Sequence, residues 1–250
     1  MINPIHKALS VMQASKVRTL LMGGQACILY GGAEFSRDVD LAVLAVPDNL
    51  ERLSHAMAAL QASVIAVPPF TPAHLLRGHA VHFRCAHPDA AGLRIDIMST
   101  MRGVDPFEEL WIRRTTLKVS PGLSLDLLSL PDLVKAKKTQ RDKDWPMIRR
   151  LLEADYARAA GKQPEETQVQ FWLREARTAG ILEELAKHYP ALVAQEQTRR
   201  PLLKQVGAGN IADLERALLD EELAERQADH LHWEPLRREL EQLRHGTRNG

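Results

Sequence analysis

The chain has 250 residues, of which 45% are hydrophobic and 26% charged, and its 33 basic side chains nearly balance its 32 acidic ones. This length predicts one large domain or two modest ones, and the near-neutral charge argues against a dedicated DNA-binding protein. No apolar run reaches the ~20 residues of a membrane span, and the N-terminus lacks the pattern of a secretory signal. Cys27 and Cys85 each lie in an apolar stretch. We therefore expect a cytoplasmic protein with two buried, reduced thiols.

The first 130 residues alternate strand-like segments with helical ones. Residues rich in Val, Ile and Leu predict strands at 17–22, 38–46, 80–86, 93–98 and 115–119. Between them, residues 25–32 and 48–61 have the composition of helices, and Asp48 is placed to cap the second helix. This alternation predicts an α/β domain over residues 1–130.

From about residue 131 the strand signals disappear. Within 131–160, helical spacing puts Trp145, Ile148, Leu151 and Leu152 on one face, so this helical segment is predicted to pack on the α/β domain. Residues 161–250 are predicted to form a helical C-terminal region that begins with a linker. Its expected helices lie at 167–178, 181–189, 211–227 and 234–244. The stretch 230–244 is amphipathic, which suits packing on the domain or on another chain.

Paired glycines mark the turn between the first strand and the helix that follows it. Gly23 and Gly24 would let the backbone approach a ligand, and main-chain N–H groups at a helix start favour phosphate. Many such turns are Gly-Gly for steric reasons alone, so both interpretations stay open. With Gly31 and Gly32, the spacing fits neither a Walker loop nor a Rossmann loop.

Three aspartates interrupt strands that are otherwise apolar. Asp38 and Asp40 share one face of their strand, whereas Val39 and Leu41 point the other way. Asp96 interrupts the strand at 93–98 in the same manner. Grouped carboxylates on an apolar strand repel one another and lose solvation, and a divalent cation relieves both costs. If the two strands are neighbours, the three side chains could hold two Mg²⁺ ions for phosphoryl or nucleotidyl transfer.

Together these features resemble the nucleotidyltransferase fold of the DNA polymerase β superfamily, in particular small bacterial nucleotidyltransferases of the abortive-infection toxin type. The resemblance covers residues 15–150 and includes 130–145, which is similar to a family segment of the form Leu-x-x-Leu…Lys…Arg-x-Lys-Asp. Gln25 departs from the family, which has a small residue there. The fold implied is a mixed sheet flanked by helices. The matching residues are Gly23, Gly24, Ser36, Asp38, Asp40 and Asp96.

The resemblance implies Mg²⁺-dependent transfer of a nucleoside monophosphate from an NTP to an acceptor hydroxyl of RNA (such as tRNA), a protein or a small molecule. Asp38, Asp40 and Asp96 would ligate two Mg²⁺ ions, and Asp96 would also act as the base. Lysines and an arginine beyond the sheet would offset phosphate charge. The nucleotide-binding residues implied are Gly23, Gly24, Ser36, Lys137, Lys138 and Arg141.

Several alternatives remain open. The chain could be a regulatory protein on the same scaffold, such as a toxin–antitoxin component that binds a partner protein. Transfer to an aminoglycoside-like molecule would need acids in the helical region. The basic run at 135–143 could contact RNA or a triphosphate, but a solvated helix face is the favoured explanation for most of its residues. A solvated face also suffices for the second Asp-x-Asp at 142–144. The acids available in the helical region are Glu183, Glu184, Glu221 and Glu222.

Histidines cluster between the two acidic strands. Their spacing matches no standard zinc pattern, so surface positions or contacts to a nucleobase are expected instead. Phe70 and Arg77, in the loop 68–79, are further candidates to contact a base. The clustered histidines are His74, His79, His82 and His87.

Overall fold

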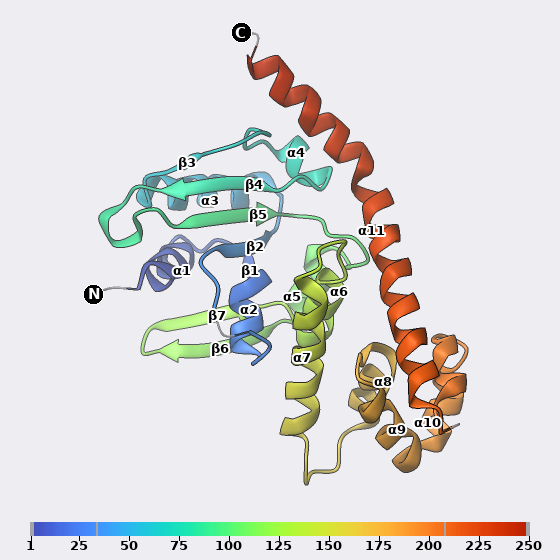
Figure 1. Cartoon of the computed structure of the whole chain (residues 1–250). Helices are drawn as coiled ribbons and strands as arrows, with labels where there is room; N and C mark the ends of the chain where they lie inside the picture. The colour runs from blue at the N-terminus through green and yellow to red at the C-terminus, as the bar shows by residue number, and fades with distance from the viewer. Residues whose placement is uncertain (1–2, 34, 208, 249–250) are drawn as a thin grey trace. The chain divides into compact units, whose positions relative to one another are not determined.

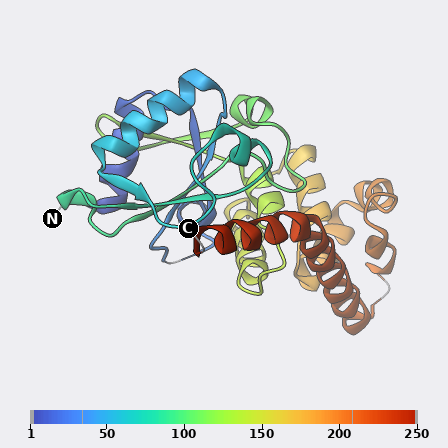
Figure 2. The ribbon, with the colours of Figure 1, turned by 90° about the horizontal axis from the view of Figure 1, so that it is seen from above.

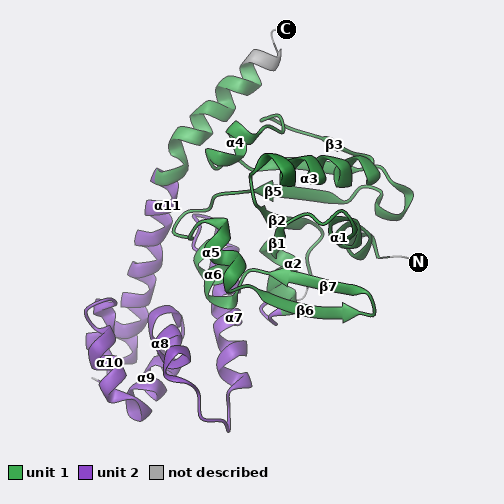
Figure 3. Cartoon of the chain, turned by 180° about the vertical axis from the view of Figure 1, so that it is seen from behind, with its two compact units in different colours: residues 1–29, 34–136, 232–250 green, residues 30–33, 137–231 purple. Residues whose placement is uncertain are grey.

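A computed structural model describes residues 3–33, 35–207 and 209–248 (Figure 1). The chain divides into two compact units, coloured separately in Figure 3. Unit 1 comprises residues 1–29, 34–136 and 232–250, and unit 2 comprises residues 30–33 and 137–231. The division after residue 136 differs from the predicted boundaries at 130 and 160. It also assigns the end of the chain to the first unit.

Unit 1 is built on a seven-stranded mixed sheet. The strands are β1 (Thr19–Met22), β2 (Val39–Val43), β3 (Ala62–Val64), β4 (Val81–Cys85), β5 (Arg94–Met98), β6 (Thr115–Ser120) and β7 (Leu123–Leu127). Their order is β3-β4-β5-β2-β1-β7-β6, and only the β2–β5 and β1–β7 pairs of this described sheet are parallel. The sequence patterns predict β1, β2, β4, β5 and β6. They give no expectation for β3, which has three residues, or for β7, which has five.

Helices complete unit 1, and Figure 2 shows α1 and α3 on one side of the sheet. The helices are α1 (Pro4–Ala14), α2 (Gly23–Leu29), α3 (Pro47–Ala59), α4 (Pro72–Leu76), α5 (Phe107–Ile112) and α6 (Leu130–Ala136). The prediction that Asp48 caps α3 is wrong, because the helix already begins at Pro47 and its N-cap is Val46. Proline suits the first helical position because the N–H it lacks would have no partner there. Asp48 lies in the first turn instead.

The two faces of the central strands differ in burial. Val39, Leu41 and Ile97 are at most 1% exposed and belong to the core. On the opposite face Asp40 and Asp96 are only half-buried. The alternation predicted from the sequence is thus confirmed, and the acids lie on the more open face of the sheet.

Unit 2 is helical. It contains α7 (Asp144–Arg158), α8 (Glu166–Glu175), α9 (Ala179–His188), α10 (Pro190–Glu196) and the first part of α11 (Ile211–Arg248). The predicted apolar face of α7 is confirmed, since Trp145, Ile148, Leu151 and Leu152 are all buried. The two helices expected at 211–227 and 234–244 form one continuous helix that includes Pro235. In the described part of the chain, no helix is long and apolar enough to cross a membrane.

Both cysteines are buried, as the sequence predicts. Cys27 lies in α2 and Cys85 at the end of β4, and neither side chain is more than 2% exposed. Burial raises the pKa of the Cys85 thiol, because the thiolate form loses solvation. A raised pKa makes this thiol a poor nucleophile.

The last part of α11 packs on the segment before β4. The Nε2 atom of His79 lies 2.9 Å from a carboxylate oxygen of Glu239, which also pairs with Arg77. Gly78 lies so close to the Trp233 ring that a Cβ atom there would be 3.1 Å from it. The amphipathic stretch at 230–244 therefore packs on the domain, one of the two outcomes expected from its sequence.

Because His79 is buried, this contact is expected to depend on pH. Burial, with the charges of Arg77 and His74, lowers the pKa of His79 below its usual value of 6.5. The unfolded chain binds a proton at this histidine more readily, so the free energy of unfolding should decrease as pH falls below about 6.5. Denaturant titrations between neutral and acidic pH measure this slope. His79→Gln should flatten the slope, whereas His55→Gln, at an exposed position, should not. Equal slopes for wild type and His79→Gln would contradict the prediction.

Candidate active site

Asp40 and Asp96 occupy paired positions in the sheet. β2 and β5 are parallel neighbours, and their register places Asp40 opposite Asp96. Adjacent strands are about 4.8 Å apart, and paired positions share a face. Asp38 comes immediately before β2 and is half-buried. The condition set from the sequence, that the two acidic strands be neighbours, is therefore met.

The Gly23-Gly24 turn lies directly against Asp40. Gly23 has φ +64°, and a Cβ atom there would lie 1.8 Å from Oδ2 of Asp40. A Cβ atom at Gly24 would lie 2.4 Å from Oγ of Ser36, and its N–H donates a long hydrogen bond of 3.4 Å to Oδ2 of Asp40. Both glycines are thus required by close approach alone. The turn, Ser36 and Asp40 form one packed cluster.

Gln25, which departs from the family pattern, holds the segment that leads into β2. Its side-chain amide donates a hydrogen bond of 2.8 Å to the main-chain carbonyl of Ser36. The Ser36 hydroxyl in turn donates to the carbonyl of Asp38 at 3.4 Å. Gln25 therefore fixes the path of the chain just before the first two acids.

Asp96 is held by a histidine and an arginine on the same face. Nδ1 of His82, which faces Asp96 across the β4–β5 register, lies 2.9 Å from its Oδ1 atom. Nε of Arg94 donates to the same oxygen at 2.7 Å. Burial alone would raise the pKa of Asp96, but the contacts with His82 and Arg94 outweigh it and lower the pKa. Asp96 is accordingly a carboxylate at neutral pH.

Arg94 serves as a cation within the acid cluster. Its pKa is raised, first by the hydrogen bond to Asp96 and further by the charges of Asp96, Asp38 and Asp40. The sequence contains one signal for this role, because Arg94 is two residues from Asp96 and shares its face. For His82 no such signal exists, since its position opposite Asp96 is set by strand pairing.

The donor chemistry of the cluster suits a hard divalent cation, because paired carboxylates are the oxygen ligands that Mg²⁺ takes in proteins. In the described residues, however, no three His, Cys, Asp or Glu side chains are placed to hold a metal ion. The carboxylates are engaged by other groups instead of converging on one point. Asp96 is bonded to Arg94 and His82, and Asp40 accepts a hydrogen bond from the Gly24 N–H. A metal ion bound here would compete with Arg94 for Asp96.

The clustered histidines have different partners within unit 1. The contacts are His74 with Thr71 at 2.8 Å, His79 with Glu239 at 2.9 Å, His82 with Asp96 at 2.9 Å, and His87 with the Asp89 N–H at 3.1 Å. Of the two candidate base contacts, Phe70 packs edge-on against Phe83 and Arg77 pairs with Glu239. His82 is thus the member of this group that reaches the acids.

Lys137, Lys138 and Arg141 belong to unit 2, where each pairs with a carboxylate. Asp144 is fully buried, and it accepts hydrogen bonds from Lys137 at 2.9 Å and from Arg141 at 2.8 Å. Lys138 pairs with Glu175 at 2.7 Å. The expectation of a solvated helix face is therefore wrong for Lys137 and Asp144, which form a buried ion pair at the start of α7.

No model of a known protein family matches this chain, and a comparison with curated proteins found no match to its sequence. The features of this chain that point to a function are the acid cluster and the glycine turn beside it.

Proposed function

We propose that this protein is a Mg²⁺-dependent nucleotidyltransferase, which transfers a nucleoside monophosphate from an NTP to an acceptor hydroxyl. The observation that carries the proposal is the pairing of Asp40 with Asp96 on the more open face of the sheet, beside the Gly23-Gly24 turn. A strand, a Gly-Gly turn, a helix and then acids on two adjacent parallel strands resemble the nucleotidyltransferase fold of the DNA polymerase β superfamily.

Asp38, Asp40 and Asp96 would hold the metal, and bound Mg²⁺ would neutralise the triphosphate and activate the attacking hydroxyl. Both described contacts of Asp96 are made by its Oδ1 atom. Its Oδ2 atom is therefore the one proposed to accept the proton of the acceptor hydroxyl. The Gly24 N–H and the Ser36 hydroxyl, which lie beside Asp40, are the proposed donors to the triphosphate.

The acceptor is proposed to be RNA or protein rather than an aminoglycoside-like molecule. The acids that could bind a small cationic acceptor already form hydrogen bonds or ion pairs with other residues of unit 2. Their partners are Gly207 for Glu183, Tyr156 for Glu184, Arg177 and Arg200 for Glu221, and Arg226 for Glu222. Breaking these contacts would add a cost to small-molecule binding.

Calorimetric titration with Mg²⁺ and each NTP tests the nucleotide site. Wild type is expected to bind an NTP only when Mg²⁺ is present, and Asp38→Asn should weaken this binding at least about tenfold, since it removes one ligand charge. Asp105→Asn, an exposed aspartate of unit 1 that pairs with Arg113, is the matched control. Equal affinities for wild type and Asp38→Asn would overturn the proposed site.

A second candidate is a regulatory protein on the same scaffold, such as a toxin–antitoxin component with a partner protein. The position of Arg94 favours it, because this side chain already supplies positive charge among the acids. Such a protein would bind nucleotide or partner without transferring a nucleotidyl group. Transfer of label from the NTP distinguishes the two candidates.

A further inference from the structure

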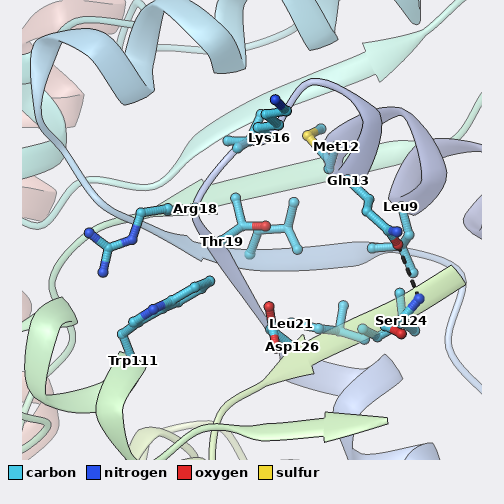
Figure 4. A pocket seen from close by; sticks show the side chains of 13 residues that line it. Leu9, Met12, Gln13, Lys16, Arg18, Thr19, Leu21, Trp111, Ser124 and Asp126 are labelled. Carbon is cyan, nitrogen blue, oxygen red and sulfur yellow. Dashed lines mark hydrogen bonds between the residues drawn. The ribbon is translucent and has the colours of Figure 1, made fainter. Parts of the chain in front are cut away.

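A pocket of about 270 Å³ lies in unit 1, on the sheet face opposite the acids (Figure 4). Its floor includes Leu21 and Leu41, which are paired on β1 and β2 and alternate with Asp40. Leu125 of β7 and Trp111 of α5 line it as well. The pocket is therefore separate from the proposed active site.

The pocket is a gap between two strands of the same sheet. The register of β1 with β7 is confined to Leu21 and Leu127, so the strands separate toward Thr19. Gln13 of α1 holds the start of β7 on the far side of the gap. Its side-chain amide donates to the Gly122 carbonyl at 3.1 Å, and its oxygen accepts from the Ser124 N–H at 3.1 Å (Figure 4). The two hydrogen bonds hold the start of β7 to α1, so that it does not pair with β1 there.

The edge of β1 that faces the gap carries main-chain polar groups. The main chain of Leu21 accepts a hydrogen bond from Leu128, which shows that this residue faces β7. Hydrogen-bonding direction alternates along an antiparallel strand, so the main chain of Thr19 faces the same way, into the gap. The Thr19 side chain also lines the pocket.

The charges around the pocket leave one cation uncompensated. Arg18 pairs with Glu108 at 2.6 Å, and Asp126 pairs with Arg114 at 3.0 Å. Within the described residues, the Lys16 ammonium and the Thr19 hydroxyl take part in no hydrogen bond or ion pair. Both line the pocket, so it offers a positive charge and a hydroxyl above an apolar floor.

An aromatic wall completes the site. The guanidinium groups of Arg18 and Arg114 lie 4.8 Å and 4.1 Å from the centre of the Trp111 ring. Cations at this distance are attracted to an aromatic face, so they fix the position of the ring. Trp111 is therefore a rigid apolar surface as well as a fluorescent reporter for the pocket.

We infer that this pocket binds a small organic anion with a short aliphatic body, a carboxylate of this kind being the simplest form. The anionic group would contact Lys16 and Thr19, and the aliphatic body would lie on the leucine floor beside Trp111. The volume is slightly below the ~300–1,000 Å³ of sites for drug-sized molecules, which limits the ligand to a short chain. Because the pocket lies on the other face of the sheet, this inference is independent of the proposed transferase activity.

Binding of hexanoate to the full chain tests the inference, with hexanol and hexylammonium as probes that lack the negative charge. Ligand-observed NMR should show saturable binding of hexanoate in the millimolar range or tighter, and much weaker binding of the other two. Lys16→Gln is expected to weaken hexanoate about tenfold, because a charge-assisted hydrogen bond is lost. Thr19→Val should weaken it by a smaller factor. Hexanoate is also expected to change the tryptophan fluorescence of the wild type, because Trp111 lines the pocket. Trp111→Phe should abolish this fluorescence change while NMR still detects binding.

Lys118→Gln, which removes an exposed lysine of β6 outside the pocket, is the matched control and should bind hexanoate as wild type does. Lys16 is itself exposed, so its replacement should leave the fold intact. Absence of hexanoate binding to wild type would overturn the inference. So would equal affinities for wild type and Lys16→Gln, or equal binding of hexanoate and hexylammonium.

Discussion

Replacement of Asp96 by asparagine is expected to lower the rate of nucleotidyl transfer by about 10²–10³-fold, if the acid cluster is catalytic. The change removes a metal ligand charge and the proposed base while it keeps the size of the side chain. A loss of several kcal/mol of transition-state stabilisation corresponds to a decrease of this order. The measurement is kcat for incorporation of nucleotide label into acceptor, with circular dichroism to verify that the fold is retained.

Asp105→Asn is the control for this prediction. Asp105 also pairs with an arginine in unit 1, but it lies outside the sheet. Its replacement should leave kcat unchanged, because surface ion pairs contribute little and the acid cluster is untouched. An Asp96→Asn protein that turns over like wild type would remove Asp96 from the catalytic account.

Replacement of Asp144 by alanine is expected to destabilise unit 2 by about 3–5 kcal/mol, the usual cost of leaving a buried charge without its partner. Asp144 is fully buried, and the ammonium of Lys137, whose side chain is 9% exposed, pairs with it. Thr139 would lose its bond to the same carboxylate. Burial alone would raise the pKa of Asp144, but Lys137 and Arg141 outweigh it and lower the pKa, so the charged form is the native one. Urea denaturation followed by tryptophan fluorescence measures the loss.

Two further variants serve as comparisons for the predicted loss of stability in Asp144→Ala. Asp142→Ala, at a side chain that is 94% exposed, should change the free energy of unfolding by no more than about 0.5 kcal/mol. The double variant Lys137→Met and Asp144→Leu should recover much of the loss, because an apolar pair can replace a buried ion pair. If Asp144→Ala were no more costly than Asp142→Ala, the buried ion pair would not stabilise unit 2.

The parts of the site that could be predicted are those encoded within a single strand. Alternation places Val39 and Leu41 in the core and Asp40 on the opposite face, and the same rule applies to Asp96. The pairing of Asp40 with Asp96 could only be stated as a condition, because strand order depends on contacts between residues distant in sequence. For the same reason His82, which reaches Asp96 from β4, could not be selected from the other histidines.

Burial of charged residues was the main feature that local patterns could not predict. The run at 135–143 is polar except for Ala136 and is typical of a solvated face, yet Lys137 lies inside a buried ion-pair cluster centred on Asp144. The sequence predicts a separate helix at 234–244, but α11 runs through this stretch without a break and includes Pro235. The glycines show a different case. The sequence indicates Gly23 and Gly24 by their conformational freedom, and the structure adds the contacts with Asp40 and Ser36 that require them.

Transfer of label from a nucleotide tests the central claim most directly. The full chain is incubated with Mg²⁺, cellular RNA and protein, and an NTP labelled on either the α- or the γ-phosphate. Nucleotidyl transfer joins the α-phosphorus to the acceptor and releases pyrophosphate. We therefore predict that the α-label becomes covalently bound to RNA or protein while the γ-label leaves as pyrophosphate. Transfer of the γ-label, or binding of Mg²⁺ and NTP with no transfer of either label, would contradict the account.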